Sequence, residues 1–151
     1  MLATPETIIA FDFGLRRIGL AVGQQVTFSA NSITTVKNGK KGPDWDSIES
    51  IIKEWQPDRL IVGLPTINSR ETQSIESKIK IFIDQLERFS LPVQTVDENY
   101  SSLEAKSILK HNRQLGVQGK INKESIDSTA AKLIAERWLK IQSDMLTKKN
   151  K

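Results

Sequence analysis

An apolar run near the amino end of the chain contains a single acidic residue, and this combination restricts the possible folds. Residues 8–13 read Ile-Ile-Ala-Phe-Asp-Phe, so both alternating faces are apolar except at Asp12. This pattern is typical of a central strand that is covered on both sides. A buried carboxylate costs free energy unless a cation, a metal ion or hydrogen-bond donors compensate it. Asp12 is therefore either a structural cap of the following glycine turn or a ligand at the end of the strand.

The rest of the pattern predicts an α/β fold in one domain. Three strands come first, and strands and helices then alternate. The expected strands are 8–13, 18–23, 26–36, 59–64 and 93–96, and the expected helices are 45–55, about 69–89 after a capping box at 68–71, 101–110 and 123–141. Three leading strands favour an antiparallel unit, whereas the later alternation favours parallel strands. We therefore expect a mixed five-stranded sheet with helices on both faces.

Length and charge narrow the class of protein. The 151 residues fit one domain, with an ordered core over about residues 7–141 and a basic tail over 142–151. Lys and Arg number 22 against 18 Asp and Glu, a net charge of +4 that is compatible with a polyanionic partner. The loop at 37–42 and the tail at 148–151 hold basic clusters, which either lie free in solvent or contact phosphate.

Several partners and chemistries are excluded or disfavoured. No apolar stretch approaches the roughly 20 residues of a membrane span, and residues 1–7 do not resemble an export signal, so no membrane partner is expected. The absence of cysteine excludes a thiolate nucleophile and disulfides and is compatible with the cytosol. His111 is the only histidine and lies in a polar loop, and no Walker A or GxGxxG motif is present.

Two further carboxylates occupy positions like that of Asp12. Glu98 follows the strand at 93–96, at the carboxyl end where open α/β sheets bind ligands. Asp127 lies early in the last predicted helix, and the helical repeat puts it on the same face as Ile134 and Trp138. This face is apolar, so we expect Asp127 to point towards the sheet.

Three inward carboxylates from separate segments suit a divalent metal ion. Mg²⁺ and Mn²⁺ prefer hard oxygen ligands, which Asp12, Glu98 and Asp127 would supply. Such ions can promote in-line attack of water on a phosphodiester. The residues therefore indicate a Mg²⁺ or Mn²⁺ site for phosphodiester hydrolysis, although some triple among 18 acids can always be arranged.

Colinear motifs resemble a known family. They occur in one order from about residue 7 to 140 and comprise Phe11-Asp12-Phe13-Gly14, Arg17-Ile18-Gly19, Ile61-Val62-Gly63-Leu64-Pro65, Asp97-Glu98 and Asp127-Ser128 before an alanine pair. The chain resembles the YqgF/RuvX family of Holliday junction resolvase-like proteins, which are also described as pre-16S rRNA nucleases. The resemblance implies an RNase H-like fold, a bacterial cytoplasmic location and metal-dependent hydrolysis of nucleic acid. It also implies that Asp12, Glu98 and Asp127 are the catalytic acids.

The resemblance leaves the substrate open. Maturation of the 5′ end of pre-16S rRNA is the leading expectation, and cleavage of branched DNA is the alternative. We expect five residues to help hold the nucleic acid: Arg16, Arg17, Arg70, Ser101 and Ser102. The protein is expected to be a monomer or a weak homodimer.

The chain departs from the family pattern near the acids. Asn99 stands where the family usually has Arg, Ser125 where a Lys is common, and the loop after Pro65 lacks an Asp-Gly pair. The first two changes each remove a phosphate-neutralising cation. They motivate a second hypothesis, that of a non-catalytic RNA-binding factor in ribosome maturation. An actin-like ATPase would need two such domains, for which 151 residues are too few.

Overall fold

A six-stranded mixed sheet forms the centre of the protein. The computed structural model of the chain describes residues 4–64, 70–97 and 123–149. The strand order is β4-β3-β2-β1-β5-β6. The strands are β1 (Thr7–Phe13), β2 (Arg17–Gln24), β3 (Ser29–Gly39), β4 (Gly42–Pro43), β5 (Arg59–Leu64) and β6 (Val93–Asp97).

The pairing of the strands confirms the predicted mixed sheet. β1, β2 and β3 pair antiparallel, whereas β5 pairs parallel with both β1 and β6. The carboxyl ends of β1, β5 and β6 therefore lie at one edge of the sheet. This edge is where the sequence predicted a site.

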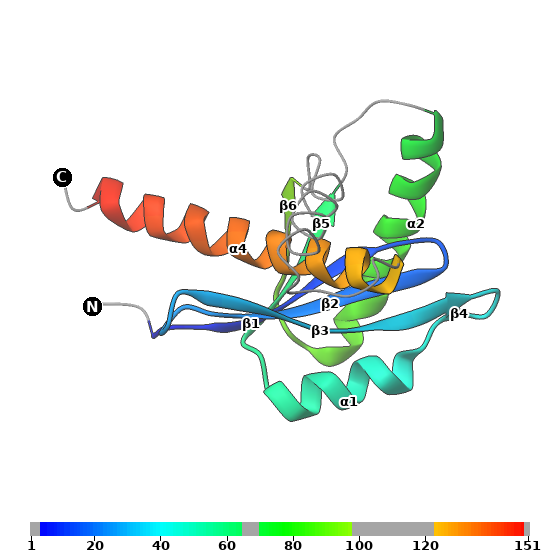
Figure 1. Cartoon of the computed structure of the whole chain (residues 1–151), viewed down its shortest axis with the longest axis horizontal. Helices are drawn as coiled ribbons and strands as arrows, with labels where there is room; N and C mark the ends of the chain where they lie inside the picture. The colour runs from blue at the N-terminus through cyan, green and yellow to red at the C-terminus, as the bar shows by residue number, and fades with distance from the viewer. Residues whose placement is uncertain (1–3, 65–69, 98–122, 150–151) are drawn as a thin grey trace, which may run out of the picture.

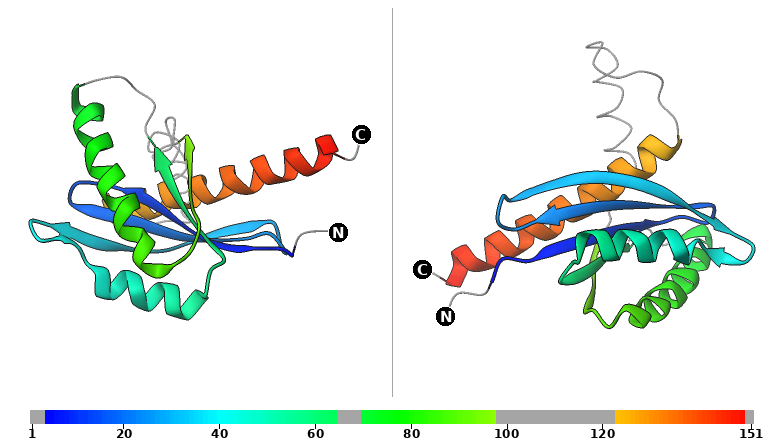
Figure 2. Two further views of the ribbon diagram at one scale, coloured as in Figure 1. Left: turned by 180° about the vertical axis from the view of Figure 1, so that it is seen from behind. Right: turned by 90° about the horizontal axis from the view of Figure 1, so that it is seen from below.

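Two helices cover one face of the sheet and a third covers the other (Figures 1 and 2). The helices α1 (Trp45–Trp55) and α2 (Arg70–Leu86) share a core with Phe11 of β1. The helix α4 (Lys123–Lys149) packs on the opposite face, where Ala10 belongs to a second core. The sheet is thus buried on both sides, as the apolar run at 8–13 predicted.

The structure corrects the predicted number of strands. The predicted basic loop at 37–42 is a hairpin, in which β3 runs to Gly39 and β4 pairs back onto it. Gly42 has φ +96°, a conformation that favours glycine, and it allows this tight return. The sheet therefore has six strands rather than five.

Three predicted boundaries also differ. The third strand begins at Ser29 rather than at residue 26, because residues 25–28 form a turn closed by the Phe28 N–H donating to the Gln25 carbonyl at 3.1 Å. The second helix ends at Leu86, and a short 3₁₀ helix, Glu87–Phe89, follows. The last helix continues to Lys149 instead of ending near residue 141, so most of the expected basic tail is helical.

Local hydrogen bonds explain where α1 begins. Asp44 is the N-cap and accepts hydrogen bonds from the backbone N–H of Ser47 at 3.3 Å and from the Ser47 hydroxyl at 2.7 Å. These bonds hold the pKa of the Asp44 carboxyl below its usual value. The cap places Trp45 against Phe82 of α2, with the ring centroids 5.6 Å apart. No helix within the described ranges is long and apolar enough to cross a bilayer.

Candidate metal and nucleic-acid site

Asp12 is a buried acid on the face of the sheet that α4 covers. Only 7% of its surface is exposed. Because strand side chains alternate, Asp12 shares its face with Ala10, which packs in the core beneath α4. On β2, the residue paired with Asp12 is Gly19. On β5, Val62 pairs with Phe11, so the next residue, Gly63, lies beside Asp12. Neither glycine has a side chain that could cover the carboxylate from its neighbouring strand.

The end of β6 lies two strands from Asp12. Asp97 is the last residue of β6 and is the register partner of Leu64, the last residue of β5. Glu98 is the next residue in the sequence and lies outside the described residues. The structure therefore positions the strand that leads to Glu98.

The backbone of α4 places residue 127 in the row that packs on the sheet. Asp127 precedes Ala130 and Ala131 by three and four residues, and both alanines are fully buried. It precedes the fully buried Ile134 by seven residues, two helical turns. The side chain of Asp127 lies outside the described part of the structure.

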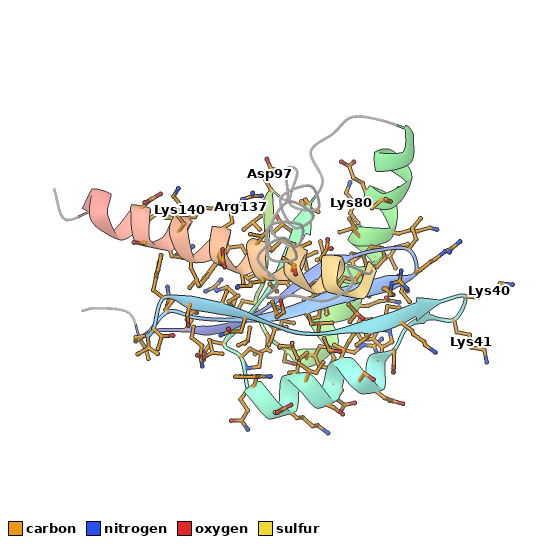
Figure 3. All side chains as sticks on the ribbon, viewed as in Figure 1. Lys40, Lys41, Lys80, Asp97, Arg137 and Lys140 are labelled. Carbon is orange, nitrogen blue, oxygen red and sulfur yellow. The ribbon has the colours of Figure 1, made fainter. Side chains whose placement is uncertain are left out.

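Two neighbouring residues of α4 bind the helix to β6. The guanidinium Nη1 of Arg137 donates a hydrogen bond to the main-chain carbonyl of Asp97, and Figure 3 shows the two residues together at the end of β6. Trp138 Nε1 donates to Gln94 Oε1 at 3.2 Å. These contacts fix the edge strand directly before Glu98 to the helix that carries Asp127. The role of Arg137 was not predicted, because nothing in the local pattern links it to a strand 40 residues away.

Asn38 holds the turn that follows Asp12. Its Nδ2 donates to the Gly14 carbonyl at 2.7 Å, and its backbone N–H donates to the Arg16 carbonyl at 2.8 Å. A Cβ at Gly14 would lie 2.5 Å from the Arg17 carbonyl oxygen, so the turn requires glycine there. No sequence pattern indicates this role of Asn38, which lies within a basic cluster but is itself buried.

The predicted nucleic-acid contacts are placed only in part. Arg16 is exposed on the turn between β1 and β2, and Arg17, the first residue of β2, is half-buried. Arg70 is the first residue of α2, but its side chain is not among those described, and Ser101, Ser102 and Asn99 lie outside the described residues. The described side chains contain no group of three or more acids or histidines that could hold a metal ion; of the predicted set they include Asp12 alone.

Comparison with known proteins identifies the family. A model of the RuvX family, described as Holliday junction resolvase, matches residues 6–141. The chain belongs to the RuvX family. The match covers all the motifs on which the predicted resemblance rested, so that prediction is confirmed.

Relatives of this RuvX-family chain match it over most of its length. A protein of Saccharophagus degradans is 40% identical over 136 residues, which are 89% of this chain and 94% of the relative. A protein of Legionella pneumophila strain Paris is 45% identical over 133 residues, 87% of this chain and 93% of the relative. Each of the two is named "Putative pre-16S rRNA nuclease".

A solved structure supports the fold assignment. Thermus thermophilus RuvC in complex with a Holliday junction substrate superposes with a TM-score of 0.56 at 12% identity, covering 92% of this chain and 96% of RuvC. At this identity the likeness concerns the fold. Together with the strand order, it confirms the predicted RNase H-like architecture of this RuvX-family chain.

Proposed function

We propose that this RuvX-family protein is a divalent-metal-dependent nuclease. The observation that carries the proposal is Asp12, a carboxylate with 7% exposure at the carboxyl end of a central strand, on the α4 face and between two glycine positions. A hard oxygen donor in such a place suits Mg²⁺ or Mn²⁺. A purely structural cap would not need the glycines on both neighbouring strands.

Glu98 and Asp127 would complete the set of ligands with Asp12. Val96 packs against α4, and because strand side chains alternate, continuing the strand would put residue 98 on the same side. Residue 127 belongs to the row of α4 that faces the sheet. When bound, divalent ions supply a charged centre that activates water and stabilises the leaving oxygen of a phosphodiester. Arg16, Arg17, Arg70, Ser101 and Ser102 would bind the nucleic-acid backbone around these acids.

The proposed substrate is the 5′ end of pre-16S rRNA, and the protein would act in the cytoplasm. The relatives with 40–45% identity carry the corresponding name. A Holliday junction is the second candidate substrate, because the family model is described by that activity.

A cleavage assay tests both the chemistry and the substrate. The full chain is incubated with a precursor rRNA end and with a four-way DNA junction, each with Mg²⁺, with Mn²⁺ and with EDTA. We expect metal-dependent cleavage of the precursor RNA at a rate at least about tenfold above that of the junction. Binding of RNA that is equal with and without EDTA, together with no cleavage of either substrate, would instead support the non-catalytic RNA-binding hypothesis.

Replacing Arg137 tests whether this residue positions the end of β6 for catalysis. Replacement of Arg137 by Gln removes the donor to the Asp97 carbonyl and should free the strand end that leads to Glu98. We expect the cleavage rate to fall about tenfold, since small misplacements of catalytic groups have large costs, and the half-saturating Mg²⁺ concentration to rise. Because Arg137 is half-buried and one hydrogen bond contributes about 1 kcal/mol, the free energy of unfolding should change little.

Lys140→Gln is the matched control for Arg137→Gln. Lys140 lies one turn further along α4 and is exposed, so the variant removes the same charge without touching β6. The cleavage rates of the parent and of both variants are measured as a function of Mg²⁺ concentration. Equal half-saturating Mg²⁺ concentrations for Arg137→Gln and the parent would refute a positioning role.

A further inference from the structure

A groove of about 330 Å³ lies on the face of the sheet opposite Asp12. It is bounded by the turn between β1 and β2, the β3–β4 hairpin and α2. The residues that line it include Phe13, Leu15, Lys40, Lys78, Ile81 and Phe82. Phe13 follows Asp12 in β1 and points to the other face. The groove and the proposed catalytic acid therefore lie on opposite faces of the sheet, near the same end of β1.

The lining of the groove combines cations with exposed apolar surface. Lys40 of the hairpin and Lys78 of α2 are the charged residues, and no Asp or Glu is among the described residues that line it. Leu15 is 49% exposed and Ile81 57% exposed, and both line this groove. The amides of Asn38 and Gln85 also line the groove. A ligand that fits offers negative charge and an apolar surface together.

An unpaired nucleotide has this chemistry. Its phosphate pairs with lysine, its base packs on apolar side chains, and its base edge can bond to the exposed amide of Gln85. Asn38 also ties the hairpin to the carbonyls of Gly14 and Arg16, so the groove and the turn after Asp12 form one connected wall. The groove therefore adjoins the turn that follows Asp12.

We propose that this groove binds an unpaired nucleotide of the substrate strand, outside the catalytic site. The proposal rests on the proposed nuclease function, because the strand is taken to continue from the acids. A second copy of the chain is a poorer occupant. A two-fold dimer through this surface would bring Lys40 and Lys78 close to the same lysines of its partner.

Equilibrium binding tests the role of the two lysines. Both proteins carry Asp12→Asn, so that cleavage does not interfere, and one also carries Lys40→Gln and Lys78→Gln. Their affinity for a labelled single-stranded RNA is measured by fluorescence anisotropy. We expect affinity to fall about tenfold, in keeping with the loss of two charged contacts. The slope of log affinity against log salt should fall in magnitude by about 1.4, or about 0.7 for each lost phosphate contact.

Lys53→Gln is the control for charge. Lys53 lies on α1, also on this face of the sheet, but is exposed and pairs with Glu49 at 3.1 Å instead of lining the groove. It should leave both affinity and salt slope unchanged. If Lys53→Gln lowered log affinity and salt slope by half as much as the double groove variant, the same loss for each charge removed, only net charge would matter and the proposal would be overturned.

Cross-linking tests the position of the strand. The chain has no cysteine, so Ile81→Cys introduces a single thiol in the groove, and Ile141→Cys introduces one on the exposed side of α4. With an RNA that carries a thiol-reactive tether on one base, we expect cross-linking at position 81 at least about tenfold faster than at position 141. Equal rates, or a change in oligomeric state of the lysine variants without a change in RNA affinity, would contradict the proposal.

The two proposals can fail separately. If the parent cleaves RNA with metal but the lysine variants bind as tightly as Asp12→Asn alone, the groove proposal is wrong and the nuclease function stands. If no substrate is cleaved but the groove variants lose affinity and position 81 cross-links, the groove binds nucleic acid and the nuclease function is wrong.

Discussion

Replacing Asp12 by Asn should reduce metal-dependent cleavage at least about a thousandfold, an increase of about 4 kcal/mol in the activation free energy. Asn keeps the shape of the side chain but removes the negative charge that the proposed metal ion requires. The substitution also neutralises one member of the proposed cluster of acids, whose like charges repel one another in the metal-free protein. We therefore expect the variant to stay folded, with a melting temperature equal to that of the parent or higher.

Asp144→Asn is the control for this substitution. Asp144 is an exposed acid of α4, the helix that also carries Asp127, and its replacement makes the same change in net charge. Its cleavage rate should equal that of the parent. A well-folded Asp12→Asn protein that cleaves as fast as the parent would show that Asp12 is a structural cap and not a ligand.

Replacing Trp138 by Ala should have the largest effect on stability. Trp138 is 1% exposed and is the largest fully buried side chain among the described residues. It packs between α4 and the sheet, beside Ile61 and Val96. Removal of a buried Trp or Phe typically costs about 3–5 kcal/mol through lost burial and the cavity that remains. We expect urea denaturation to show a loss of this size.

Trp138→Phe separates packing from hydrogen bonding. Phe keeps most of the ring but cannot donate to Gln94 Oε1, so only about 1 kcal/mol from that bond should be lost, besides a smaller packing term. If Trp138→Ala costs less than 1 kcal/mol, α4 is not held on the sheet as described. The position of residue 127 relative to Asp12 would then lose its support.

Local patterns were sufficient to predict the central strands and both limits of α1, whereas the predicted helix at 101–110 lies outside the described residues. The run at 8–13 is apolar on both faces, which indicates a strand that is buried on both sides. Asp44 followed by apolar residues at helical spacing marks the start of α1. The β4 strand was missed because two residues, Gly42 and Pro43, carry no periodic pattern. The carboxyl end of α4 was placed too early because its last turns are polar and resemble a solvated tail.

The candidate site was predictable only as far as single elements position its residues. Burial of Asp12 followed from its strand, and the row of residue 127 followed from helical spacing. By contrast, Asn38 and Arg137 act through contacts with residues 24 and 40 positions away. Such contacts depend on how the elements pack together, which no local pattern specifies. The same reason hid the groove between α2 and the hairpin.

Binding of Mn²⁺ to the full chain is the most direct test of the central claim that Asp12, Glu98 and Asp127 hold a metal ion together. Electron paramagnetic resonance distinguishes free from bound Mn²⁺ and is applied to the parent, Asp12→Asn, Glu98→Gln, Asp127→Asn and Asp144→Asn. The parent and Asp144→Asn should bind with equal affinity, and each of the other three variants should bind at least about tenfold more weakly, a loss of about 1.4 kcal/mol. Unchanged Mn²⁺ affinity in all three acid variants would contradict the claim.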